Sequence, residues 1–170
     1  MIYKLFPKTY SSLIIFALVM SLGICLRLYQ LDRALGGGDE NEILMYYVYR
    51  PILFIITNYT ENYHHIFHTI LLHFMAVWFG EENAWAIRGP AFISGIICLV
   101  MIYKVTMQLF SSQWVARIAL LLAAVCPVHV YYSQTARGYS LSMALAIVMI
   151  FSAVKLLESD KSSKWVLSLI

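Results

Sequence analysis

Four apolar runs, at residues 11–29, 89–107, 114–132 and 139–157, constrain this chain more than any other feature of its sequence. A helix of about 20 apolar residues crosses the hydrocarbon core of a bilayer. Hydrophobic residues make up 61% of the chain and charged residues only 12%, whereas about 25% of a soluble domain is charged. The sequence therefore predicts an all-α membrane protein with several transmembrane helices.

The two ends of the chain bear on its domain organisation. The first run follows Lys4 and Lys8 and is too long for the apolar region of a secretory signal, so we expect a retained membrane anchor. A further apolar start, at residues 165–170, breaks off after little more than one helical turn. We therefore expect residues 1–170 to form a single transmembrane domain that is the N-terminal part of a longer one.

A shorter apolar stretch, at residues 66–79, decides the topology. It contains His68 and His73, and it either crosses the membrane or lies flat on its surface as an amphipathic helix. Cytoplasmic loops are enriched in basic residues, and only the flat arrangement keeps every lysine on the inner side. We therefore expect residues 31–88 to form an outer loop with surface helices at residues 42–50, ending before Pro51, and 66–79. This assignment places five arginines on the outer side: Arg27, Arg33, Arg50, Arg88 and Arg137.

Two adjacent carboxylates, Asp39 and Glu40, follow three glycines just beyond the first run. Acidic residues close to a membrane are costly and mark functional sites, and glycines let the backbone approach a ligand closely. We predict that the pair of Asp39 and Glu40 forms the catalytic base site of a membrane enzyme. The alternative is a helix N-cap, in which Asp39 caps a helix that begins at Glu40 and Glu42 completes a capping box.

Polar residues between the third and fourth runs form a second candidate group. The segment at residues 131–139 reads YYSQTARGY. Arginine suits bidentate binding of phosphate, so Arg137, with Gln134 beside it, is predicted to bind a phosphate- or pyrophosphate-bearing substrate. The alternative is an arginine that snorkels to lipid headgroups. Arg88, at the outer start of the second run, has the same two interpretations, a substrate-phosphate ligand or a headgroup anchor.

The histidines are the third candidate group. His64, His65 and His68 are spaced so that two of them could share a helix face and bind a metal ion. No third ligand with fixed spacing is visible in the sequence, so we predict no metal site, although a divalent metal stays open as a cofactor. We expect His64 and His65 to hydrogen-bond a substrate, with a hydrogen bond to the backbone as the alternative, and His73 and His129 to be structural. The sequence has no basic tract with interleaved aromatics, so we predict no nucleic-acid partner.

The order of these motifs resembles that of a known family. A first span is followed by Asp-Glu, an amphipathic helix, and the segments NYHHIFHTILL at residues 62–72, WFGEENAWAIRGP at 78–90 and YYSQTAR at 131–137. From about residue 10 to residue 157 the chain resembles the N-terminal half of the GT-C superfamily of integral-membrane glycosyltransferases. It is most similar to the branch of protein O-mannosyltransferases and bacterial aminoarabinose transferases.

The resemblance implies an activity, partners and residue roles. Such enzymes transfer a sugar from a polyprenyl-phosphate carrier to a glycan, lipid or protein acceptor, at a hydroxyl or an amine, on the non-cytoplasmic face of the membrane. Asp39 matches the family's catalytic aspartate, which deprotonates the acceptor. Glu40 matches its acidic neighbour, and Arg137 matches a position near the lipid phosphate. The expected location is a bacterial inner membrane.

Two positions depart from the family's pattern. Gly138 and Tyr139 follow Arg137 where an acidic residue often stands, and Ile66 follows His65 where many members have proline. The first departure puts a second catalytic or metal-binding acid in doubt. The competing interpretation is a truncated, non-catalytic membrane subunit or a transporter fragment. Transporters place ionisable residues near the bilayer midplane, and the clustering of charges outside the predicted spans disfavours that interpretation.

Overall fold

The computed structural model describes residues 10–36 and 38–157, and all regular elements in this part of the chain are helical. The all-α fold class is therefore confirmed. The elements are α1 (Tyr10–Leu28), α2 (Asp39–Ile43), the π-helix η2 (Leu44–Val48), α3 (Ile52–Thr57), α4 (Ile66–Phe79), α5 (Ala84–Phe110), α6 (Gln113–Val125), α7 (Pro127–Ser133) and α8 (Tyr139–Leu157). Lys4, Lys8, Lys161, Lys164 and the apolar start at residues 165–170 lie outside the described residues.

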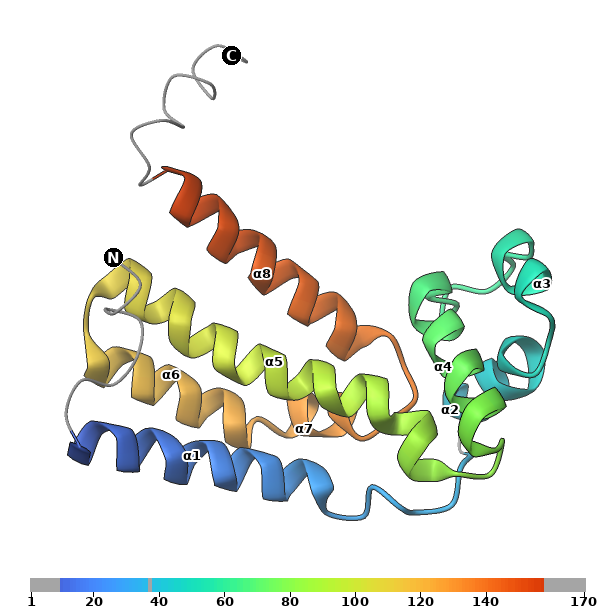
Figure 1. Cartoon of the computed structure of the whole chain (residues 1–170), viewed down its shortest axis with the longest axis horizontal. Coiled ribbons are helices and arrows are strands. Elements are labelled where there is room, and N and C mark those ends of the chain that lie inside the picture. The colour runs from blue at the N-terminus through green and yellow to red at the C-terminus, as the bar shows by residue number, and fades with distance from the viewer. Residues whose placement is uncertain (1–9, 37, 158–170) are drawn as a thin grey trace, which may run out of the picture.

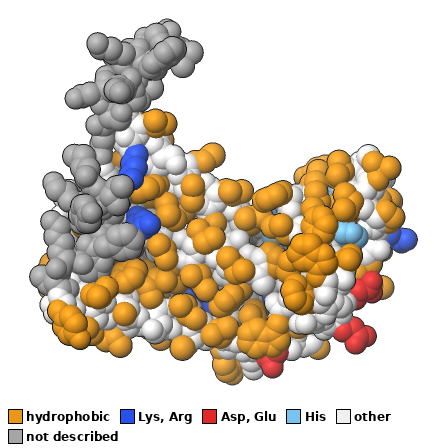
Figure 2. Space-filling view, in the orientation of Figure 1, with side chains coloured by type: hydrophobic (Ala, Val, Ile, Leu, Met, Phe, Trp, Pro, Cys, Tyr) orange, Lys and Arg blue, Asp and Glu red, His pale blue; other side chains and the backbone are white. Residues whose placement is uncertain are grey.

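The long helices form an apolar bundle with α5 at its centre (Figure 1). Helices α1, α5 and α8 are each long and apolar enough to cross a membrane, and the bent pair α6 and α7 makes a fourth span if it is counted as one. Helix α5 contacts α1, α4, α6, α7 and α8. Figure 2 shows hydrophobic side chains over most of the visible face of the bundle, as expected for a surface that meets lipid. The protein is therefore an integral membrane protein.

Small residues allow the bundle helices to approach closely. Ala116, Leu120 and Ala124 lie on one face of α6 and pack, fully buried, against α5. A Cβ added at Gly23 of α1 would lie 2.7 Å from a Leu99 methyl group and 3.2 Å from the Ala124 side chain. Small residues at such crossings increase the van der Waals contact that drives helix association in membranes.

The shorter helices form a cap at one end of the bundle, where α1 ends and α5 begins (Figure 1). Its core joins α2, η2, α4, the start of α5 and the segment after α7, through the residues Ile43, Leu44, Tyr47, Val48, Leu72, Ala76, Ile87 and Ala136. Helix α4 has the predicted bounds. The predicted helix over residues 42–50 begins three residues earlier and widens into the π-helix η2 before it ends at Val48.

Two expectations about the bundle are wrong. The run at residues 114–132 is not one continuous helix, because α6 and α7 meet at a bend of 61° beside Pro127. A proline in this position lacks the N–H that a continuous helix needs. Arg27 does not lie among the outer charges; it is part of α1 and fully buried. The span helices therefore contain two fully buried charged residues, Arg27 in α1 and Arg88 in α5, so the charges do not all lie outside the spans as expected.

Candidate active site

A cavity of about 500 Å³ opens at the cap end of the bundle. Its walls come from the segment after α1, the start of α2, and the region from α7 to α8. The lining residues are Gln30, Arg33, Gly36, Gly38, Asp39, Glu40, Tyr131, Thr135 and Arg137. Segments about 100 residues apart in sequence thus enclose one polar space at the end of an apolar bundle. Such a cavity can admit both a lipid-borne and a water-borne molecule.

Asp39 is the first residue of α2, and Gly38 occupies the N-cap position with a φ of 54°. The capping interpretation of Asp39 is therefore wrong by one residue, and no side chain caps this helix. Because its carboxylate is not used as a cap, Asp39 forms an ion pair with Arg137 instead. The Asp39 side chain remains 45% exposed and that of Arg137 15% exposed. A half-exposed carboxylate at the cavity wall can reach an incoming proton donor.

Glu40 points away from that pair and into the protein. Its Oε1 and Oε2 accept hydrogen bonds of 2.9 and 2.7 Å from Arg88, and the backbone N–H of Ala136 donates to Oε1 at 2.8 Å. Burial would raise the pKa of Glu40, but these bonds and the charge of Arg88 outweigh it and hold that pKa below its ordinary value. Glu40 is therefore a buried carboxylate that joins α2, α5 and the segment after α7.

Arg88 completes this buried connection. Besides the two bonds to Glu40, it donates to the backbone carbonyls of Leu31, Arg33 and Ala34 at 2.6–3.2 Å. These bonds use all five N–H donors of a guanidinium group, and Arg88 is fully buried. Neither predicted role of Arg88, substrate-phosphate ligand or headgroup anchor, agrees with these contacts. Arg88 instead fixes the chain that leads from α1 to Asp39.

Arg137 is held at the cavity by aromatic side chains. Its guanidinium carbon lies 4.7 Å from the ring centroid of Tyr139 and 6.0 Å from that of Tyr132. Its Nη2 donates a hydrogen bond of 3.1 Å to the Tyr139 hydroxyl. Stacking of this kind orients an arginine fork. Arg137 thus borders the cavity in a fixed orientation, with Asp39 as its carboxylate partner.

Gln134 has a different role from the predicted one. Both hydrogen bonds from its Nε2 go to backbone carbonyls at the end of α1, to Leu26 at 2.8 Å and Tyr29 at 2.7 Å. The last carbonyls of a helix have no intrahelical partner, so Gln134 caps α1. Its side chain joins α7 to α1 and is not part of the cavity wall.

The histidines lie in the cap. His64 is buried and stacks on Tyr47, with ring centroids 3.8 Å apart. The His65 ring meets the edge of Tyr139 at 5.1 Å and so supports Arg137 indirectly. Burial lowers the pKa of His64, of His65 and, to about 4, of His68, so these rings are neutral at pH 7. Within residues 10–36 and 38–157, no three His, Cys, Asp or Glu side chains are arranged to hold a metal ion.

Sequence reasoning missed one charged residue of the cavity wall. Arg33 lines the cavity and donates a 2.9 Å hydrogen bond to the Gln134 carbonyl. Its residue type and place in the sequence alone assign it only to the outer charges. The signal was its position, six residues before Asp39 in the short connection from the first span.

Residues 63–170 match the family model described as dolichyl-phosphate-mannose-protein mannosyltransferase. No curated protein and no solved structure matches the chain. The matched stretch includes all the residues predicted above to bind substrate, and it begins after both predicted catalytic carboxylates.

Proposed function

The chain belongs to the dolichyl-phosphate-mannose-protein mannosyltransferase family, and on that premise we propose that Asp39 and Arg137 form its reaction centre. As a member of this family it is a GT-C glycosyltransferase that uses a lipid-linked sugar donor. The observation that carries the proposal is the ion pair between Asp39 and Arg137 at the wall of a cavity of about 500 Å³. It places a carboxylate and a guanidinium, the two groups that the transfer needs, side by side.

Each group has one task in the proposed reaction. The donor is a sugar linked through its anomeric carbon to a polyprenyl phosphate. The acceptor is a hydroxyl, or an amine, of a glycan, a lipid or a protein. Asp39 takes the proton of the acceptor while the acceptor atom bonds to the anomeric carbon. The bond from that carbon to the phosphate oxygen breaks, and the electron pair leaves with the lipid phosphate. Arg137 stabilises the charge that develops on the phosphate.

The ion pair fits a simple order of events. The Asp39 carboxylate neutralises Arg137 in the pair. When the donor phosphate binds, it takes the place of the carboxylate at Arg137, because a phosphate is a strong bidentate partner for arginine. Asp39 is then released towards the acceptor. Donor binding thereby prepares the base, and holding both substrates in one cavity removes much of the entropy cost of their encounter.

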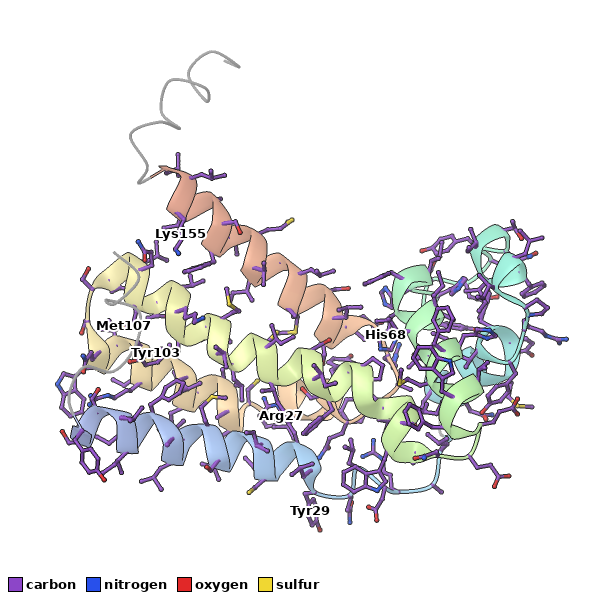
Figure 3. The ribbon with its side chains drawn as sticks, in the orientation of Figure 1. Arg27, Tyr29, His68, Tyr103, Met107 and Lys155 are labelled. Carbon is purple, nitrogen blue, oxygen red and sulfur yellow. The ribbon has the colours of Figure 1, made fainter. Side chains whose placement is uncertain are left out.

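We further propose that the cavity faces the non-cytoplasmic side of a bacterial inner membrane and that residues 1–170 form one transmembrane domain with four crossings. The described charges support this orientation. The carboxylates of the cap lie at the cavity end, whereas Lys155 lies at the opposite end of the bundle (Figure 3). Basic residues are enriched on the cytoplasmic side.

Substitution Asp39→Asn tests the assignment. We expect turnover to fall by about 100- to 10,000-fold, the usual effect of losing a general base, while folding and membrane insertion are unchanged. Dolichyl-phosphate mannose is the first donor to assay, with release of dolichyl phosphate as the readout. Asp32→Asn is the matched control, since Asp32 is an exposed acid in the same connection. Unchanged turnover in Asp39→Asn would remove the proposal.

A further inference from the structure

The bend between α6 and α7 leaves two backbone carbonyls inside the bundle without their helical hydrogen-bond partners. In a continuous helix the carbonyl of Ala123 accepts from the N–H of residue 127, and that of Ala124 from the N–H of Val128. Pro127 has no N–H, and Cys126 is extended with a ψ of 116°. Both carbonyls therefore lose their helical partners. In lipid, such groups must find a partner within the protein.

Arg27 supplies that partner. Its Nη2 donates to the Ala123 carbonyl at 3.2 Å and its Nη1 to the Ala124 carbonyl at 3.1 Å. The Nη1 group also donates to Gly23 at 2.8 Å, and Nη2 to His129 Nδ1 at 2.7 Å. The side chain is fully buried, and Figure 3 shows it between α1 and α5, where α7 begins. One guanidinium thus holds two carbonyls of α6 and one histidine of α7.

A glycine of α5 lets α7 approach beside this contact. A Cβ added at Gly95 would lie 2.7 Å from Ser133 Cβ and closer still to its Oγ, and at van der Waals distance, 3.5 Å, from Arg27 Nε. The two ion pairs found among the described residues join other side chains. The charge of Arg27 is therefore spread over carbonyl dipoles and an imidazole. This geometry needs the planar fork of arginine, because one lysine ammonium cannot reach these acceptors with the same directions.

The bend determines where the reaction centre lies. Helix α7 is attached to α1 near both of its ends, by the hydrogen bond between Arg27 and His129 in its first turn and by the hydrogen bonds of Gln134, just after its last residue, to the end of α1. Arg137 follows three residues after Gln134. A change in the direction of α7 therefore moves Arg137 relative to Asp39, which is carried by a different helix.

We propose that Arg27 is a positioning residue: it stabilises the bend between α6 and α7 and thereby sets the distance between Arg137 and Asp39. The proposal rests on the proposed function for its catalytic consequence. Its structural part, the bend held by Arg27, does not depend on which sugar or acceptor is used.

Variants of Arg27 and Pro127 distinguish an effect on the position of Arg137 from an effect on the stability of the fold. Arg27→Met leaves the two carbonyls without donors, so we expect a lower melting temperature, weaker binding of dolichyl phosphate, and turnover reduced by about 100-fold, as for a misplaced reacting group. Adding Pro127→Ala restores an N–H at residue 127 and allows a continuous helix. The double variant should regain thermal stability, but its dolichyl phosphate binding should stay weak because the bend is lost.

The control is Arg117→Met, because Arg117 lies on α6 and is bonded to Ser12 and Gln113, away from the bend. Pro127→Ala should not restore its stability. Recovery of both stability and dolichyl phosphate binding in the Arg27→Met/Pro127→Ala variant would overturn the positioning role. So would unchanged binding in Arg27→Met alone.

A distance measurement keeps this test independent of the reaction. Spin labels at exposed Leu18 on α1 and Tyr131 on α7, with the three native cysteines replaced by alanine, report the direction of α7. We expect the distance distribution to shift in Arg27→Met. If it shifts although the unsubstituted protein binds neither dolichyl phosphate nor another polyprenyl phosphate, the proposed function fails and the structural role of Arg27 stands. An unshifted distribution overturns the inference about Arg27.

Discussion

Asp39 and Glu40 are adjacent carboxylates, but their surroundings predict that mutation of one lowers turnover and mutation of the other lowers stability. Glu40→Gln removes the negative charge that faces Arg88 across hydrogen bonds of 2.7 and 2.9 Å, at a site where Arg88 is fully buried. Breaking a buried ion pair by removing one partner costs about 3–5 kcal/mol. Asp39→Asn breaks a pair whose carboxylate is 45% exposed, and such pairs contribute about 0–1 kcal/mol. Glu40→Gln should therefore lower stability, and Asp39→Asn should lower turnover.

The pH dependence gives this prediction a second test. The pKa of Glu40 is held below its ordinary value of 4.5 in the folded protein. The unfolded chain therefore binds a proton at Glu40 more readily, so the stability from this group is complete above pH 4.5 and is lost as the pH falls through the folded pKa. On acidification the free energy of unfolding of the unsubstituted protein should fall by the contribution of Glu40. In Glu40→Gln this part of the decrease should be absent, because glutamine does not bind a proton in this pH range.

Equilibrium unfolding in detergent micelles, from pH 7 down to pH 3, measures both effects. Arg88→Met should resemble Glu40→Gln in cost, and the double variant should cost less than the sum of the two, as expected for residues in direct contact. It should not return to full stability, because the carbonyls of Leu31, Arg33 and Ala34 also lose their donor. A loss below about 1 kcal/mol in Glu40→Gln, or strict additivity with Arg88→Met, would refute the reasoning.

Two further substitutions test the remaining contacts of the site. Arg137→Lys removes the planar fork, and with it a charge-assisted hydrogen bond worth about 1.5–3 kcal/mol, so dolichyl phosphate should bind roughly 10- to 100-fold more weakly. Arg50→Lys is the control. Binding by Arg137→Lys that equals that of the unsubstituted protein would contradict the proposed phosphate site. Gly138→Ala would place a Cβ 2.5–2.7 Å from the His65 side chain and should cost about 1–3 kcal/mol through overpacking. A loss that persists at full size in the His65→Gly background, which removes the whole side chain, would show that this contact is not its cause.

Local sequence was sufficient for several helices. The bounds of α4 agree with the apolar stretch at residues 66–79, and α8 begins at Tyr139, where the stretch at residues 139–157 begins. Each of these ends lies next to a histidine or a glycine, so it is set by nearby residues alone. The break at Pro127 was also visible locally, but a hydropathy average counts proline as one residue among 19 and hides the missing N–H. The bend becomes acceptable only because Arg27, about 100 residues away in sequence, donates to the freed carbonyls.

The sequence by itself determined that the chain is an all-α membrane protein and that its polar chemistry follows the first and third apolar runs, because hydropathy and spacing are local properties. The residues taken alone, without the family resemblance, did not distinguish Asp39 from Glu40, or Arg137 from Arg88, since each pair shares its charge and its place beside a span. The tertiary structure gives the members of each pair different surroundings. Successive residues of a helix point about 100° apart, so Glu40 faces Arg88 in the protein interior while Asp39 faces Arg137 at the cavity. That difference depends on how α2 is packed, which is decided by residues far away in the chain.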